Sequence, residues 1–232
     1  MPNLPSFNAL LFGLGGCLVD FGSRATALAL QRLAHSDTDP GLTHWSEQNA
    51  STVEQQAYLQ ALCEVADELS EATPGALPLL HQLHEQHIAC AWLDQQPRDA
   101  SMRLAQALPQ WLPGITWQQH RPWPAPDSIW HSLIQLQVER LDGCVLISGE
   151  PKLLQAGLNA GLWTVGLATC GPLCGLALGD WQSLEGARRD QLRSQATLSL
   201  YRLGVHSVID QLTELPACLA DLNLRRSKGE KP

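Results

Sequence analysis

The sequence predicts an α/β protein built on a doubly wound parallel sheet, with a small helical insert after the first strand. Short apolar runs recur along the chain and alternate with segments of helical periodicity. Strands that are apolar throughout are typical of parallel sheets that helices cover on both faces. In such sheets ligands bind beyond the carboxyl ends of the strands. Functional residues are therefore expected just after Phe12, Ala91, Ile147 and Leu167.

The first strand is expected at residues 7–12, where an apolar run stops at a glycine turn. Further strands are expected at 88–93, around Ile115, and at 144–147, 163–167 and 206–209. Helices are expected from Ser23 onward and over 51–69, 73–87, 98–108, 127–138, 153–160, 191–203 and 215–222. In the helix that follows the insert, Thr73 is the expected N-terminal cap and Pro74 lies near its first position. The expected division is a core of 1–22 with 73–232 and a helical cap insert of 23–72.

Composition excludes several classes of partner. The 232-residue chain is 44% hydrophobic and 16% charged, which fits a compact globular protein. Its formal net charge of −8 should repel nucleic acid and anionic membranes. No apolar run reaches the roughly 18 residues that span a bilayer, and the N-terminus lacks a secretory pattern. Basic residues near the C-terminus are expected to form a solvated tail: Arg225, Arg226, Lys228 and Lys231.

The cysteines indicate a reducing, cytoplasmic setting. Seven cysteines occur at irregular spacings, and several lie in apolar runs, where a free thiol behaves as a small hydrophobe. Cys170 and Cys174 have a spacing that could hold a metal, but no second ligand pair accompanies them. We therefore expect no metal site there.

Four segments carry a family resemblance. Residues 11–23, with the sequence LFGLGGCLVDFGS, resemble the first motif of the haloacid dehalogenase (HAD) superfamily in its phosphonoacetaldehyde hydrolase, or phosphonatase, branch. Residues 73–75, 157–167 and 202–210 resemble later segments of the same branch. The resemblance covers roughly 7–23 and 73–224 and leaves the insert unmatched. It implies a Rossmann-like HAD core with a small cap.

The resemblance also implies a mechanism. Such enzymes use an aspartate after the first strand as nucleophile and a hydroxyl after the second strand to hold the phosphoryl group. A later cation neutralises charge, and an acidic pair after the fourth strand helps to bind Mg²⁺. The sequence has changed every one of these positions, which fall on Gly13, Trp92, Trp123, and the pair Ser148 and Gly149. Gly15 stands where the branch has a small or acidic residue. The Schiff-base lysine that the branch has in its insert is missing here, because the first lysine of this chain is Lys152.

These changes predict a pseudoenzyme that binds no Mg²⁺ cofactor and keeps a binding or regulatory role. Glycine supplies no nucleophile, and Mg²⁺ prefers carboxylate oxygens that are absent from the family positions. The expected partners are an unidentified protein, a second copy of the chain bound through the insert, or a small uncharged ligand beside Trp92 and Trp123.

Two alternatives remain open at this point. The first is an active hydrolase whose site is rebuilt from Asp20, Asp94 or Glu150, although ordinary loop carboxylates explain these residues as well. The second is a nucleotide-binding module, because the glycine turn of residues 13–16 follows a strand as dinucleotide-binding turns do.

Overall fold

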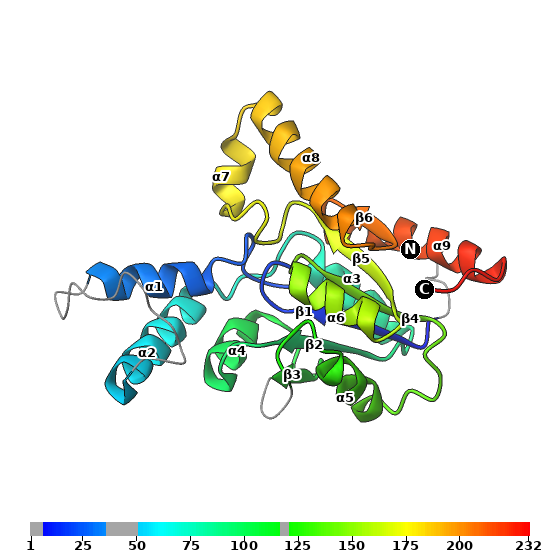
Figure 1. The fold of residues 1–232 in the computed structure, drawn as a ribbon, viewed down its shortest axis with the longest axis horizontal. Helices are drawn as coiled ribbons and strands as arrows, with labels where there is room; N and C mark the ends of the chain where they lie inside the picture. Colours follow the sequence, from blue (N-terminus) through cyan, green and yellow to red (C-terminus); the bar gives the residue numbers. More distant parts are fainter. Residues whose placement is uncertain (1–6, 36–50, 117–120) are drawn as a thin grey trace.

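A six-stranded parallel sheet forms the centre of the protein (Figure 1). The computed structural model describes residues 7–35, 51–116 and 121–232. The strands run in the order β3-β2-β1-β4-β5-β6, and every neighbouring pair is parallel. Their bounds are β1 Ala9–Gly13, β2 Cys90–Asp94, β3 Gly114–Thr116, β4 Cys144–Ser148, β5 Trp163–Leu167 and β6 Ser207–Ile209. The predicted doubly wound α/β fold is thus confirmed.

Helices cover both faces of the sheet. Their bounds are α1 Ala25–His35, α2 Thr52–Glu68, α3 Ala76–Glu85, α4 Arg98–Leu104, α5 Asp127–Gln135, α6 Pro151–Asn159, α7 Leu178–Ser183, α8 Gly186–Arg202 and α9 Leu215–Ser227. Helices α3 and α9 pack against one face of the central strands, and α5 and α6 pack against the other. This two-sided burial explains why the strands are apolar throughout instead of alternating.

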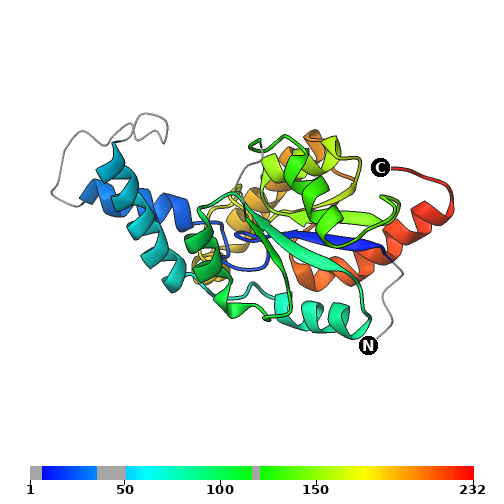
Figure 2. The same ribbon diagram turned by 90° about the horizontal axis from the view of Figure 1, so that it is seen from below.

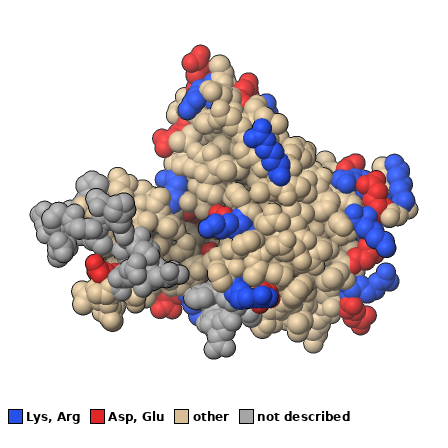
Figure 3. Space-filling model, viewed as in Figure 1, with Lys and Arg blue, Asp and Glu red and all other residues tan. Residues whose placement is uncertain are grey.

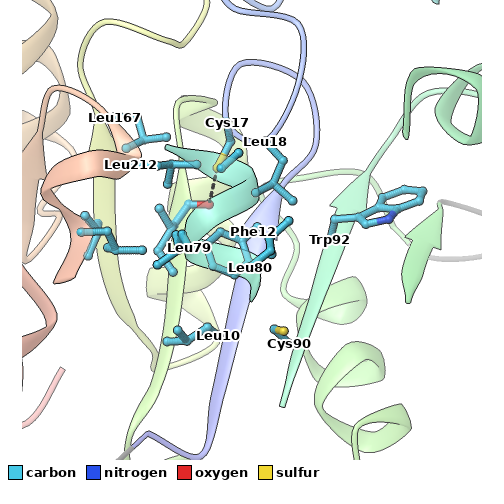
Figure 4. Close-up of a cluster of buried hydrophobic side chains, with 14 of the residues drawn as sticks. Leu10, Phe12, Cys17, Leu18, Leu79, Leu80, Cys90, Trp92, Leu167 and Leu212 are labelled. Atoms are coloured by element: carbon cyan, nitrogen blue, oxygen red, sulfur yellow. Dashed lines mark hydrogen bonds between the residues drawn. The ribbon is translucent and has the colours of Figure 1, made fainter. Parts of the chain in front are cut away.

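Strand β1 shows how the two cores are divided. Leu10 and Phe12 belong to the core beneath α3 and α9, and Ala9 and Leu11 belong to the core beneath α5 and α6. All four side chains are fully buried. Figure 4 shows the first of these cores, with Leu79 and Leu80 of α3 against β1. Each large aliphatic side chain buried in this way contributes about 2 kcal/mol to stability.

Helices α1 and α2 pack against each other and project beside the core (Figure 2). A capping box begins α2: the Ser51 hydroxyl accepts from the Glu54 N–H at 3.3 Å, and the Glu54 carboxylate accepts from the Ser51 N–H at 2.6 Å. Helix α2 also packs against α4, where Arg103 pairs with Asp67. These contacts fix the helical cap, defined as α1 and α2, against the carboxyl end of the sheet.

The structure shows that Thr73 is not the N-terminal cap of the helix that follows the insert. Helix α3 begins only at Ala76, and its N-cap is Gly75, which adopts a left-handed backbone with φ of 85°. The Thr73 hydroxyl instead donates to the Cys17 carbonyl in the turn after β1. The predicted cap therefore holds the β1 turn, because a glycine two residues later is better able to take the backbone conformation that starts the helix.

The C-terminal end differs from the expected solvated tail. Helix α9 continues to Ser227. Arg225 lies 4.9 Å from the Trp163 ring centroid and donates to the His206 carbonyl at 3.0 Å. Arg226 pairs with Asp142 across the chain. The expectation is wrong for these two arginines, because their side chains reach back to the core, whereas Lys228 and Lys231 are exposed.

Among the described residues, the helices are too short or too polar to cross a bilayer.

Candidate functional site

A cavity of about 450 Å³ opens at the carboxyl end of the sheet. The turn after β1, the ends of β2 and β4, the start of α6, and helix α1 of the cap all contribute to its walls. Gln96, in the loop after β2, donates to the Thr26 hydroxyl on α1 at 2.6 Å, so the cap and the core meet at the cavity. Figure 3 shows acidic and basic side chains around the hollow between cap and core. This position is the one that the parallel sheet predicts for a ligand site.

Gly13 lies at the end of β1, directly on the cavity. A Cβ atom added at residue 13 would lie 2.6 Å from the Ser148 hydroxyl oxygen. Ser148 ends β4, is fully buried, and its hydroxyl accepts from the Glu150 N–H at 2.9 Å. The Ser148 side chain therefore occupies the space that a side chain at residue 13 would need.

Gly149 is equally constrained by its backbone neighbours. A Cβ atom there would lie 2.5 Å from the Gly171 Cα and 2.6 Å from the Gly16 carbonyl oxygen. Three turns, after β1, β4 and β5, thus meet with no room for a side chain at residue 149. An aspartate at this position would displace backbone, which is costly.

The residues present do not fit the Mg²⁺ ion of the phosphonatase branch. The serine hydroxyl at 148 is used within the loop, and residue 149 has no side chain. Within the described ranges, no three His, Cys, Asp or Glu residues converge as a metal site. Cys170 and Cys174 belong to no such group of three: the Cys174 thiol donates to the Ala168 carbonyl at 3.2 Å, and Cys170 is buried.

Trp123 forms one wall of the cavity. Its indole N–H donates to the Ser128 hydroxyl at 2.9 Å, at the start of α5. The ring also packs against the core beneath α5 and α6. An aromatic surface of fixed orientation therefore stands where the resemblance places a cation.

Trp92 requires a correction, because the structure places it in the core and away from the cavity. It lies in the middle of β2, opposite Phe12 of β1 and Gly114 of β3, and is only 2% exposed. Figure 4 shows its indole directed away from Phe12, within the same core cluster. The ring covers Gly114, where an added Cβ would lie 1.9 Å from a ring carbon. Because β2 continues to Asp94, the cavity is bordered by Leu93, Asp94 and the two glutamines that follow.

The three candidate carboxylates all line the cavity: Asp20, Asp94 and Glu150. Each also accepts hydrogen bonds that hold the chain near a helix start. Asp20 accepts from the Ala25 N–H at 2.9 Å, at the first residue of α1. Glu150 is the N-cap of α6 and accepts from the Lys152 N–H at 3.1 Å.

Asp94 accepts from the Gln95 N–H and from the Ser101 hydroxyl of α4, both at 2.8 Å. For each of the three carboxylates, these hydrogen bonds therefore support the interpretation that the side chain stabilises the local backbone.

Burial raises the pKa values of two of these groups. Asp20 is 2% exposed, and desolvation raises its pKa from the ordinary 3.8 to about 6. The Ala25 N–H and the charge of Arg24 lower it in part, whereas the charge of Asp94 raises it. Desolvation also raises the pKa of Asp94, and the charge of Glu150 adds to this effect. The three carboxylates thus share one electrostatic environment.

The glycine turn does not lead into a helix. Gly13 ends β1, the chain continues from Leu14 as turns with an isolated bridge between Gly15 and Val19, and α1 begins only at Ala25. A dinucleotide cradle places its phosphates on the N-terminus of a helix that opens within the glycine run. That arrangement is absent from residues 13–24.

Polar residues of the cavity lining that the sequence did not predict as site residues include Thr26, Gln96 and Lys152. Gln96 lies two residues after the end of β2 and Lys152 four residues after the end of β4. Their positions near the strand ends were the only signal in the sequence for a place in the site. Thr26 belongs to the insert, which had no resemblance to guide its placement.

Comparison with known proteins agrees with this architecture. The phosphonoacetaldehyde hydrolase of Bordetella pertussis is 28% identical over 180 residues, which cover 75% of this chain and 65% of that enzyme. The Bordetella avium phosphonoacetaldehyde hydrolase is 26% identical over an alignment of 262 residues, covering 97% of this chain and 94% of the enzyme.

A solved phosphonoacetaldehyde hydrolase-like protein from Oleispira antarctica superposes with a TM-score of 0.82 at 22% identity, covering 100% of this chain and 98% of that one. No protein-family model matches the chain. The similarity to phosphonoacetaldehyde hydrolases, together with superposition on a HAD family hydrolase from Deinococcus radiodurans (TM-score 0.61, 22% identity), supports placing the chain in the haloacid dehalogenase superfamily, in its phosphonatase-like branch.

Proposed function

We propose that the protein is a HAD-like pseudoenzyme that binds a small ligand in the cavity at the end of β1 and does not hydrolyse it. The observation that carries this proposal is the lack of space for a side chain at residue 13. Gly13 has no side chain, and the Ser148 hydroxyl fills the space beside it. The cavity itself nevertheless remains open, at about 450 Å³.

The chemistry of phosphoryl transfer supports the loss of catalysis. The reaction needs an in-line nucleophile and compensating positive charge around the equatorial oxygens. At the positions where the relatives' branch supplies these groups, the chain has a glycine and the indole of Trp123. The carboxylates that line the cavity would repel a phosphate dianion. These features favour binding over turnover.

A rebuilt hydrolase is the rival, with Asp20, Asp94 or Glu150 as nucleophile or base. Each of these carboxylates already accepts a hydrogen bond that fixes a loop or a helix start. A carboxylate used in this way is less nucleophilic and less free to move toward a substrate. The hydrogen bonds therefore favour the structural role for all three.

Hydrolysis assays test the proposal. Phosphate release from p-nitrophenyl phosphate and from phosphonoacetaldehyde would be followed with excess Mg²⁺, for the natural protein and for Asp94→Ala and Glu150→Ala. We expect release at the background rate in all three. Turnover by the natural protein that disappears in either variant would establish the rebuilt hydrolase instead.

Thermal denaturation with nucleotides tests the nucleotide-binding alternative. A nucleotide at a hundredfold excess over its Kd would stabilise the protein by about 2.7 kcal/mol. We expect no such shift, because residues 13–16 do not open a helix.

A further inference from the structure

We propose that the ligand of this cavity is a small organic compound that carries a primary ammonium group. This inference rests on the proposed binding function and specifies its ligand class. It differs from the expectation of an uncharged ligand, and it reverses the charge preference of an enzyme that binds phosphonates.

The charge of the cavity lining is the first support. Three carboxylates and one lysine border the same space: Asp20, Asp94, Glu150 and Lys152. Lys152 is exposed, so its charge is screened by solvent, whereas Asp20 is 2% exposed. Arg24 offsets part of the Asp20 charge from outside the cavity lining, but the lining itself has more carboxylates than cations. A further cation in the cavity would relieve the repulsion between these carboxylates.

Asp20 gives an independent second support, because one of its oxygens lacks a hydrogen-bond donor. Oδ2 accepts from the Ala25 N–H, but Oδ1 is buried and accepts no hydrogen bond. The Nε atom of Arg24 lies 3.8 Å from Oδ1, which is an ion-pair distance without a hydrogen bond. A buried carboxylate oxygen on a cavity wall is costly without a donor, and an ammonium N–H supplies one.

The other walls suit the rest of such a ligand. The indole of Trp123 is held by its bond to Ser128, and an aromatic ring beside a cation contributes favourably. Leu14, Leu93 and Leu153 also line the space and can pack against carbon atoms. The lining thus combines an anionic part with an apolar part.

A bare metal ion is a poorer fit than an organic cation. Metal binding requires several oxygen ligands within about 2.6 Å of one point. Within the part of the chain that the structure describes, no three acidic, histidine or cysteine residues converge in that way. Each N–H of an ammonium group can donate to a different acceptor, so carboxylates arranged around a space suit it without converging on one point.

The test measures binding with pairs of probes that differ only in charge. Ethylammonium, propylammonium and butylammonium chloride would be titrated against the ¹⁵N-labelled protein, and ethanol, propan-1-ol and butan-1-ol would serve as their neutral counterparts. Inorganic phosphate would serve as the anionic probe. Chemical-shift changes in two-dimensional NMR spectra give both the affinity and the site.

We expect at least one ammonium ion to bind at the cavity roughly tenfold more tightly than its alcohol. Asp20→Asn and Glu150→Gln should each weaken that binding severalfold, and Trp123→Leu should do the same. The exposed Asp180, which lies outside the cavity on α7, provides the matched control Asp180→Asn, which should leave the affinity unchanged.

Two outcomes would overturn the inference. The first is that no ammonium ion binds better than its alcohol. The second is that phosphate binds most tightly. Either result leaves the proposed binding function standing, since a neutral or anionic ligand would then occupy the cavity. Hydrolysis of a phosphorus compound would instead refute the proposed function itself, so the two failures are distinguishable. If Asp20→Asn fails to fold, the Glu150→Gln and Trp123→Leu variants still decide the question.

Discussion

Replacing Asp20 with asparagine should remove a pH-dependent loss of stability. Folding raises the pKa of Asp20 from 3.8 to about 6. A carboxyl group with a raised pKa binds its proton more tightly in the folded state. Its contribution is therefore fully present below about pH 4 and is lost as the pH rises through about 6. A shift of about two units corresponds to about 3 kcal/mol, at 1.36 kcal/mol for each unit.

Urea denaturation from about pH 4 to about pH 7 measures this effect, with circular dichroism as the signal. Other groups titrate in both proteins, so their contributions largely cancel when the two curves are subtracted. Relative to Asp20→Asn, the natural protein should lose about 2 kcal/mol of unfolding free energy across this range, which is most of the full effect. A difference that stays constant with pH would refute the view that Asp20 is a desolvated carboxylate. Asp180→Asn, at an exposed site outside the cavity, serves as the control substitution.

Three further substitutions test the packing around the site. Gly13→Asp alone should give no phosphate release with Mg²⁺ and should lower the melting temperature, because its Cβ meets the Ser148 hydroxyl at 2.6 Å. Gly114→Ala should destabilise the protein by about 2 kcal/mol or more in urea denaturation, because the added methyl overlaps the Trp92 ring. In a double-mutant cycle with Trp92→Leu, that cost should shrink, and an unchanged cost would contradict the overlap. Thr73→Val should cost about 1 kcal/mol by losing a hydrogen bond to the turn after β1; no change in the urea midpoint would contradict it.

Much of the sheet was predictable because its signal is local. Strand β5 was expected at the residues where it forms, and β1 and β4 were expected within a few residues of their bounds. These strands are short, continuous and apolar, so burial on two faces leaves few other interpretations. The predicted position of the site followed from the parallel topology alone.

The errors concern contacts between residues distant in the sequence. Trp92 was expected at the site because its position was carried over from a resemblance, yet its indole lies in the core, and Leu93 and Asp94 at the end of β2 line the cavity instead. Arg225 was expected in solvent because basic residues near a terminus usually are, and its contact with Trp163 depends on how α9 packs. The short helix α7, at residues 178–183, has too few residues to show a periodic pattern.

The crowding around residues 13 and 149 bears on how new chemistry could be introduced into this cavity. A nucleophile at residue 13 needs a smaller or rotated neighbour at residue 148, and an acidic side chain at 149 needs the turns after β1 and β5 to separate. No single substitution meets both requirements. An engineered activity should therefore start from the cavity wall that Trp123 forms instead of from residues 13 and 149.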